Sequence, residues 1–302
     1  MDELVELLKK QQKRFNKKEK DAFIKFLISQ LISSGYDYEI IESNFFGTKH
    51  VATKSDNNPS VIFLAHYDTA TTLPIWVEWL LRVFGHTRNL LTLSSIVLIF
   101  HLISLTNNAL IINLFYAIAA GSILISMIMI VNKNTMNDNT SGVLVLLLLL
   151  NRIAKQEDLK KKVKFVFTDN EEKFLAGSFQ LKRKWNQRGF NYGNRIISVD
   201  SVGSGDNIII SYNFISKLSN ELKTLFSRIG YKVKNINMFF MPFSDAYSFW
   251  RTGAVNINMM YQSILPGGYY IKNIHSKRDK VINKENISML VDALEEYVKT
   301  VC

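Results

Sequence analysis

Histidines and carboxylates that follow apolar segments are the residues of this chain best suited to chemistry. Mixed imidazole and carboxylate ligands suit zinc best, with manganese or cobalt as substitutes. A carboxylate has two oxygens, so it can also bridge two ions about 3.5–4 Å apart. The pattern therefore predicts a site for two Zn²⁺ ions with these ligands: His66, Asp138, Glu172, Asp200 and His275.

The five predicted ligands can be assigned to two separate ions. We expect Asp138 to bridge them, with His66 and Asp200 completing one ion and Glu172 and His275 completing the other. Carboxylates held this close together would repel one another in the absence of metal. Bound metal should therefore also stabilise the fold.

Two further carboxylates beside the ligands are expected to be catalytic. Glu171 precedes Glu172, so the two side chains should point in different directions, and Glu171 can face the substrate as the general base. Asp68 follows His66 by two residues, and side chains at this spacing share one face of a strand. A hydrogen bond between them would orient the imidazole.

Alternating strand and helix patterns supply the elements that must position these residues. The apolar run at 61–65 is typical of a central strand and ends at His66. Similar runs precede the Glu171–Glu172 pair and Asp200, and helical patterns lie between them. The alternation predicts a three-layer α/β/α domain with a mixed, largely parallel central sheet. Sites in such sheets form beyond the carboxyl ends of the strands, where we expect the ligands to converge.

Six short motifs resemble those of the co-catalytic zinc aminopeptidases of metallopeptidase clan MH, which include leucine-type aminopeptidases and glutamate carboxypeptidase-like relatives. The resemblance implies the same five ligands, Glu171 as base, Asp68 as orienting residue and a cis peptide bond after Asp138. It covers most of residues 36–302 outside one insert. The motifs are AHYD, NDNTSG, FTDNEE, VDSVG, SDAYSF and IHSKRD.

The chain departs from this family in three places. Ala246 stands where the family often has His or Tyr, and Ser276 stands where Thr usually follows the last histidine. Neither change removes a ligand, although both would alter the substrate pocket. The largest departure is the insert at residues 73–131, where the family normally has a short loop.

The insert is strongly apolar and predicts contact with a membrane. Residues 73–85 resemble an interfacial helix, and residues 90–105 and 109–131 contain no Asp, Glu, Lys or Arg. Because a span needs about 20 apolar residues, the two segments predict a transmembrane hairpin. A buried helical hairpin in an enlarged core is the alternative. Arg82, Arg88 and Lys133 flank the segments, so the positive-inside rule predicts a multi-pass cell-membrane protein with a cytoplasmic catalytic domain.

Composition limits the remaining function classes. The 302 residues carry a formal charge of +11, part of it in a basic N-terminal segment that either attracts anionic lipid or forms a solvated helix face. No basic–aromatic module supports nucleic-acid binding. The single cysteine, Cys302, excludes a disulfide within the chain, and the N-terminus lacks the apolar region of a secretory signal.

These observations predict a membrane-tethered zinc exopeptidase, in the first place an aminopeptidase acting on short or apolar peptides. Carboxypeptidase or glutaminyl-cyclase chemistry on the same scaffold and a non-catalytic membrane receptor are the alternatives. Peptide substrate and membrane lipid are the expected partners, and a homo-oligomer formed through the hairpin is left open. The expected parts are a basic amphipathic helical segment at 1–35, a zinc peptidase domain at 36–72 and 132–302, and the insert at 73–131.

Overall fold

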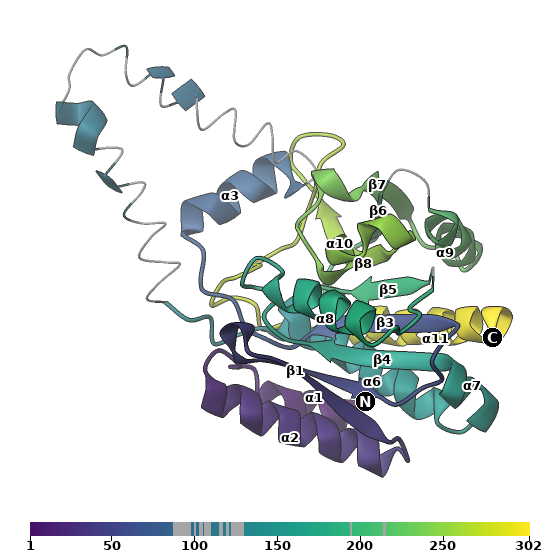
Figure 1. Cartoon of the computed structure of the whole chain (residues 1–302). Coiled ribbons are helices and arrows are strands. Elements are labelled where there is room, and N and C mark those ends of the chain that lie inside the picture. Colours follow the sequence, from purple (N-terminus) through teal and green to yellow (C-terminus); the bar gives the residue numbers. More distant parts are fainter. Residues whose placement is uncertain are drawn as a thin grey trace.

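A nine-stranded mixed sheet forms the centre of the fold (Figure 1). The computed structural model describes residues 1–86, 98–99, 101–102, 105, 110–114, 117–118, 121, 130–193, 195–213 and 216–302. Its strands are β1 (Tyr38–Ser43), β2 (Thr48–Thr53), β3 (Val61–His66), β4 (Val163–Thr168), β5 (Ile196–Val199), β6 (Asn207–Tyr212), β7 (Val233–Asn237), β8 (Val255–Gln262) and β9 (Tyr269–Tyr270).

Parallel strands occupy the middle of the sheet, and the outer parts combine antiparallel pairs with one parallel pair, β6 and the edge strand β7. β3 lies between β4 and β5 and is parallel to both, and β5 is parallel to β8. β1 pairs antiparallel with β2, β2 with β4, and β6 with β8. The predicted mixed sheet is therefore confirmed, and the carboxyl ends of β3, β4 and β5 meet at one edge.

Helices cover both faces of the sheet, which gives the predicted three layers. Alternate side chains of β3 explain this arrangement, because Phe63 belongs to one hydrophobic cluster and Ile62 and Leu64 belong to another. The first face carries α1 (Asp2–Lys9), α2 (Lys17–Ser33), α6 (Gly142–Ile153), α9 (Lys217–Arg228) and α11 (Lys284–Val301). The second face carries α8 (Ala176–Gln187) and α10 (Asp245–Ser248), and the short α7 (Glu157–Lys162) precedes β4.

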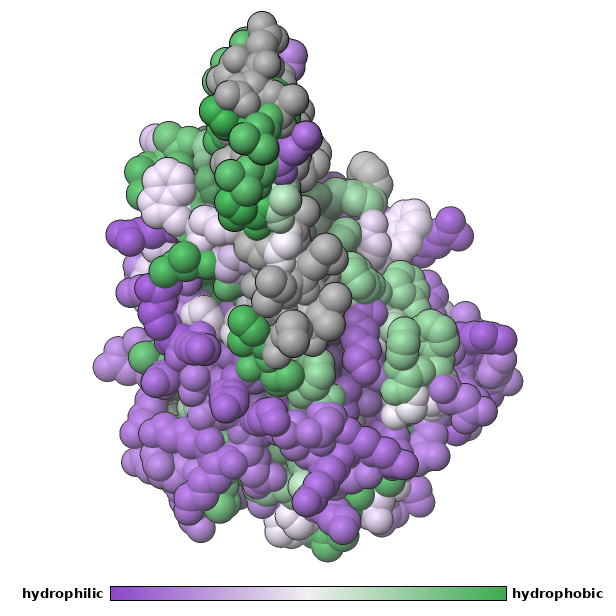
Figure 2. All heavy atoms as spheres, turned by 90° about the vertical axis from the view of Figure 1, so that its left-hand side faces the viewer, coloured by the Kyte–Doolittle hydropathy of each residue, from purple (hydrophilic) through white to green (hydrophobic). Residues whose placement is uncertain are grey.

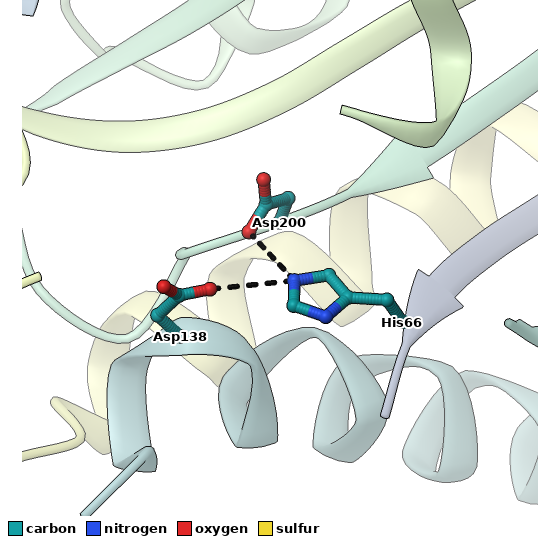
Figure 3. Close-up of side chains that lie close together, drawn as sticks. All are labelled: His66, Asp138 and Asp200. Carbon is teal, nitrogen blue, oxygen red and sulfur yellow. Dashed lines mark ion pairs between the residues drawn. The ribbon is translucent and has the colours of Figure 1, made fainter. Parts of the chain in front are cut away.

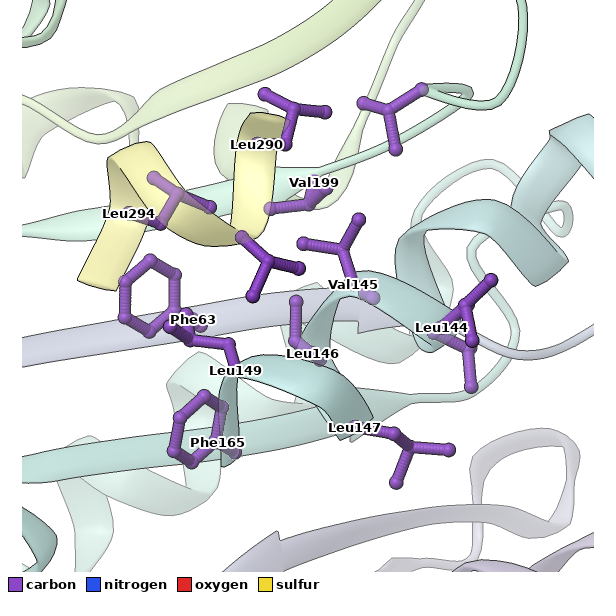
Figure 4. Close-up of a cluster of buried hydrophobic side chains, with 14 of the residues drawn as sticks. Phe63, Leu144, Val145, Leu146, Leu147, Leu149, Phe165, Val199, Leu290 and Leu294 are labelled. Atoms are coloured by element: carbon purple, nitrogen blue, oxygen red, sulfur yellow. The ribbon is translucent and has the colours of Figure 1, made fainter. Parts of the chain in front are cut away.

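Helix α6 is apolar nearly all round because it is enclosed by other elements. It packs between the sheet and α11, where Leu146 and Leu149 contribute to the buried cluster in Figure 4. In the same cluster, the rings of Phe63 and Phe165 stack with their centroids 5.6 Å apart. The core thus fixes the N-terminal end of α6, which directly follows the turn that carries Asp138.

The N-terminal segment packs into the same core. A capping box at Asn16 and Glu19 starts α2, and Phe23 and Leu27 on this helix are buried. Figure 2 shows that the lower part of the molecule, where α1 and α2 lie, is largely hydrophilic on its outer side. The proposed part boundaries after residues 35, 72 and 131 stay a prediction.

The predicted location, a multi-pass cell-membrane protein with a cytoplasmic catalytic domain, is corrected by the structure. Among the described residues, no helix is long and apolar enough to cross a bilayer. A span needs about 20 apolar residues, whereas α3 (Ile75–Phe84) at the start of the insert has 10 residues. Much of the predicted transmembrane hairpin, at 90–105 and 109–131, lies outside the described residues.

The packing of α6 leads to a prediction about stability. Leu149→Ala should lower the free energy of unfolding by about 2–5 kcal/mol, because the substitution leaves a cavity in a close-packed core. Leu148→Ala, at the neighbouring half-buried position, should cost clearly less. Chemical denaturation of both variants measures the difference, and equal losses would contradict the burial described for α6.

Candidate metal centre

Three neighbouring strands and two loops bring the five predicted ligands together. His66 ends β3, and Asp200 directly follows its parallel neighbour β5. Glu172 follows β4, which pairs with the other edge of β3. Asp138 lies in the π-helical turn Met136–Ser141 before α6, and His275 lies in the loop between β9 and α11.

The two oxygens of Asp138 face different histidines. Oδ1 lies 3.3 Å from Nε2 of His66, which is also 3.6 Å from Oδ1 of Asp200 (Figure 3). Oδ2 lies 2.9 Å from Nε2 of His275, which is 3.2 Å from Oε1 of Glu172. Asp138 thus belongs to two sets of residues that could each hold a metal ion. One set includes His66 and Asp200, and the other includes Glu172 and His275.

The donor set fits a bound cation. Oε1 of Glu172, the atom that faces Nε2 of His275, is buried and makes no hydrogen bond. The ligand atoms within each group also lie within 4.8 Å of one another, close enough to share one ion. Imidazole and carboxylate donors at this spacing suit zinc, and metal binding by these residues stays a prediction.

The pKa values of these groups reflect crowded negative charge. Burial raises the pKa of Glu171 well above its usual range, and the carboxylates of Glu172 and Asp200 raise it further. Burial also raises the pKa of Glu172. For His66, burial acts to lower the pKa, but the facing carboxylates, Glu171 first, outweigh it and bring the pKa well above 6.5. The crowded carboxylates therefore favour the binding of protons or other cations in this cluster.

Asp68 holds the loop that carries the two glutamates. Its Oδ1 accepts a hydrogen bond from the backbone N–H of Glu171 at 3.1 Å, and its Oδ2 accepts one from Glu172 at 3.2 Å. Oδ1 also lies 3.6 Å from Nδ1 of His66. Asp68 is therefore placed to position both the histidine and the predicted base.

A buried arginine that sequence reasoning did not identify connects two ligand-bearing segments. Nε of Arg14 donates to the backbone carbonyl of Tyr67, between His66 and Asp68. The terminal nitrogen Nη2 donates to the hydroxyls of Thr135 at 3.2 Å and Thr140 at 3.0 Å, on either side of Asp138. Arg14 is fully buried, and burial lowers its pKa to about 10, so it remains cationic at neutral pH.

A second cation from the N-terminal segment supports the loop before Glu171. Nζ of Lys20 lies 2.5 Å from Oδ1 of Asp169 and 2.7 Å from Oδ1 of Asn170. Both lysine and aspartate are buried, so their pairing satisfies charges that would otherwise be costly. The N-terminal segment thus contributes two buried cations behind the cluster.

Two buried aspartates in the quoted motifs also support the site. Asp279 accepts hydrogen bonds from the backbone N–H groups of Asn137 at 2.7 Å and Asp138 at 3.0 Å. Asp245 accepts a hydrogen bond from the hydroxyl of Thr168 at the end of β4. Asp279 ends the IHSKRD motif and Asp245 belongs to SDAYSF, so the motifs held a signal for both.

Unusual backbone conformations gather around the cluster. The peptide bond between Asp138 and Asn139 is cis, as the family resemblance predicts. The φ angles of Asn170, Ser201 and His275 are 56°, 53° and 49°. These values lie in the left-handed region, which residues other than glycine rarely adopt. Such residues concentrate where a fold positions functional groups.

A cavity of about 200 Å³ opens beside the ligands. Asp138, Glu171, Glu172 and Asp200 contribute carboxylates to its lining. Its other walls are apolar, and no lysine or arginine is present among the described residues that line it. The cavity therefore has carboxylates on the side of the ligands and apolar side chains elsewhere. The apolar walls come from Phe174, Leu175, Pro242, Phe243, Ile271 and Ile274.

One protein family and several solved structures are similar to this chain. The family model described as peptidase family M28 matches residues 49–298. Among solved structures, glutaminyl cyclase from Porphyromonas gingivalis is 15% identical with a TM-score of 0.67, covering 98% of this chain and 96% of that chain. No curated protein matches significantly.

Two solved peptidases have a similar fold. A leucine aminopeptidase precursor from Bacteroides thetaiotaomicron is 16% identical with a TM-score of 0.64, covering 98% of this chain and 94% of that chain. A Zn-dependent exopeptidase from Parabacteroides distasonis is 15% identical with a TM-score of 0.62, covering 97% and 94%. At these identities the likeness concerns the fold.

Metal binding should stabilise the protein measurably. Zinc at about 1,000 times its dissociation constant should raise the free energy of unfolding of the metal-free protein by about 4 kcal/mol. His275→Ala should lose most of this gain, whereas His101→Ala, at an exposed position outside the cluster, should keep it. Thermal unfolding with and without zinc tests this, and an equal gain in both variants would place the zinc elsewhere.

The contacts of Arg14 predict that replacing this one residue lowers the stability of the protein substantially. Arg14→Met should lower the free energy of unfolding by about 1–3 kcal/mol for each buried acceptor left unsatisfied. Lys13→Met removes the same charge from an exposed neighbour that pairs with Glu19, and it should cost about 1 kcal/mol or less. Denaturant unfolding of the two variants provides the measurement, and similar small losses would show that Arg14 does not hold the segments together.

Proposed function

Because this chain belongs to peptidase family M28, we propose that it is a zinc-dependent exopeptidase that removes N-terminal residues from peptides. The observation that carries this proposal is the position of Asp138, whose two oxygens face His66 and His275 separately. A carboxylate placed this way is suited to bridge two ions. His66 and Asp200 would hold one Zn²⁺, and Glu172 and His275 would hold the other.

Zinc at this position supplies a Lewis acid and lowers the pKa of water towards about 7. The remaining chemistry belongs to the chain itself. Glu171 lines the small cavity together with the ligands, and its backbone is fixed by Asp68. Burial raises the pKa of Glu171, which makes its carboxylate a stronger base towards the attacking water.

Glu171 is the proposed proton carrier. A carboxylate oxygen of Glu171 takes a proton from the attacking water as the new C–O bond forms at the scissile carbonyl. The same oxygen then gives this proton to the departing nitrogen as the C–N bond breaks. The products are a free amino acid and a peptide shortened by one residue.

The charge of the small cavity supports an aminopeptidase over a carboxypeptidase. Glu171 is the carboxylate of the lining that no proposed Zn²⁺ would neutralise, and it attracts a substrate's protonated α-amine. A C-terminal carboxylate calls for an arginine or lysine, and the described lining of this cavity contains neither. The apolar walls favour an apolar N-terminal side chain.

Glutaminyl cyclisation is the second candidate, because solved glutaminyl cyclases have a similar fold. In that reaction the α-amine attacks the side-chain amide of an N-terminal glutamine, and ammonia leaves. The same anionic cavity would receive the amine. Its apolar walls offer few partners for a glutamine amide, and an unpaired buried amide is costly, which favours peptide hydrolysis.

The two reactions are separated by incubating the zinc-loaded protein with a peptide library in free and N-acetylated forms. We expect loss of single N-terminal residues from the free forms alone, detected by mass spectrometry. Loss of ammonia from peptides that begin with glutamine would support the cyclase. Cleavage of acetylated peptides would overturn the aminopeptidase proposal.

Glu171→Gln is the matched control in the same assay. The variant should bind zinc with little change and lose turnover by about 10²–10⁴-fold, because only the proton carrier is removed. Turnover close to that of the unaltered protein would refute the role of Glu171.

A further inference from the structure

A second and larger cavity, of about 670 Å³, lies on the other side of the predicted ligands. Glu172, Phe174 and His275 line both cavities, so the larger one continues directly from the smaller. Its volume falls in the range of about 300–1,000 Å³ that is typical of ligand pockets. A peptide that crosses the ligands from the small cavity would therefore enter the larger one.

Helix α3 forms an apolar wall of this larger cavity. Trp76 and Val77 lie four and three residues before Leu80, so all three can line the cavity from one side of the helix. Trp79 is not among the lining residues and is 60% exposed. Phe15 from the N-terminal segment and Phe46 after β1 add further apolar surface to the lining.

The helix is fixed to the loop that carries His275. The backbone N–H of Leu73, just before α3, donates to the carbonyl of His275 at 2.8 Å. Nη2 of Arg278 lies 2.5 Å from a carboxylate oxygen of Glu78. At the other end of α3, a Cβ atom on Gly268 would lie 2.3 Å from the carbonyl of Phe84, so only glycine permits this close packing. The wall is therefore positioned relative to the ligands.

The two cavities differ in polarity. The small cavity contains Glu171, a carboxylate that no proposed Zn²⁺ would neutralise. The lining of the larger cavity is mainly apolar, and its lysines, Lys20 and Lys173, are balanced by the carboxylates of Asp68 and Glu172. Nζ of Lys173 also lies 5.2 Å from the ring centroid of Phe46. The aromatic and aliphatic wall of the larger cavity therefore favours apolar side chains.

We infer that the larger cavity binds the residues that follow the scissile bond and selects peptides with a large apolar residue in the second position. This inference rests on the proposed aminopeptidase activity. Its substrates are accordingly apolar peptides, distinguished by the residue after the one removed. Helix α3 of the insert is the specificity-determining element.

The test uses peptides that begin with leucine and differ only in the second residue, which is glycine, alanine, leucine or phenylalanine. For the zinc-loaded full chain, kcat/KM should be at least about tenfold higher with phenylalanine than with glycine. Trp76→Ala should reduce this ratio severalfold. Trp79→Ala, the same substitution at a tryptophan of α3 that is not among the lining residues of the cavity, should leave the ratio unchanged.

A second variant tests the cavity without removing its wall. Val77→Phe adds volume and should lower kcat/KM selectively for the phenylalanine peptide. Cleavage with no dependence on the second residue, or an equal response to Trp76→Ala and Trp79→Ala, would overturn the inference and leave the proposed activity standing. If none of the leucine peptides is cleaved, the proposed activity fails and the inference fails with it.

Discussion

Mutual repulsion between carboxylates in one buried cluster is the constraint on which the rest of this structure depends. Asp138, Glu171, Glu172 and Asp200 are brought together with two histidines by strand ends and loops. Bringing such charges out of water is unfavourable unless opposite charge accompanies them. Positive charge near these carboxylates comes from the histidines and from the buried cations of the N-terminal segment. The proposed zinc ions would add more.

The convergence of His66, Glu172 and Asp200 at one edge of the sheet could be predicted from the chain, because each of them follows an apolar run. The apolar run of β3 ends at His66, and parallel neighbours bring Asp200 and Glu172 to the same edge of the sheet. The contacts of Arg14 could not be predicted in this way. Its partners Thr135 and Thr140 lie 121 and 126 positions away, and no local pattern marks a contact over that distance.

The insert shows what composition leaves open. Residues 73–85 predicted a helix at a membrane interface, whereas α3, the helix found there, uses apolar side chains to line a cavity beside the ligands. Hydrophobic side chains at helical spacing serve equally well against lipid, a protein core or a ligand. The contacts of Leu73 and Glu78 with the loop of His275 decide between these uses for α3, and both are tertiary contacts.

The attachment of Arg14 to both ligand-bearing segments bears on how this protein can vary in evolution. The family match begins at residue 49, so Arg14 and Lys20 lie before it. A chain shortened to the matched region would keep all five predicted ligands yet lose both buried cations behind them. We therefore expect that exchanging this segment for another would disturb the loops that it supports. Substitutions at Arg14 and Lys20 should affect the site, whereas substitutions at the solvent-facing lysines of the segment should affect it little.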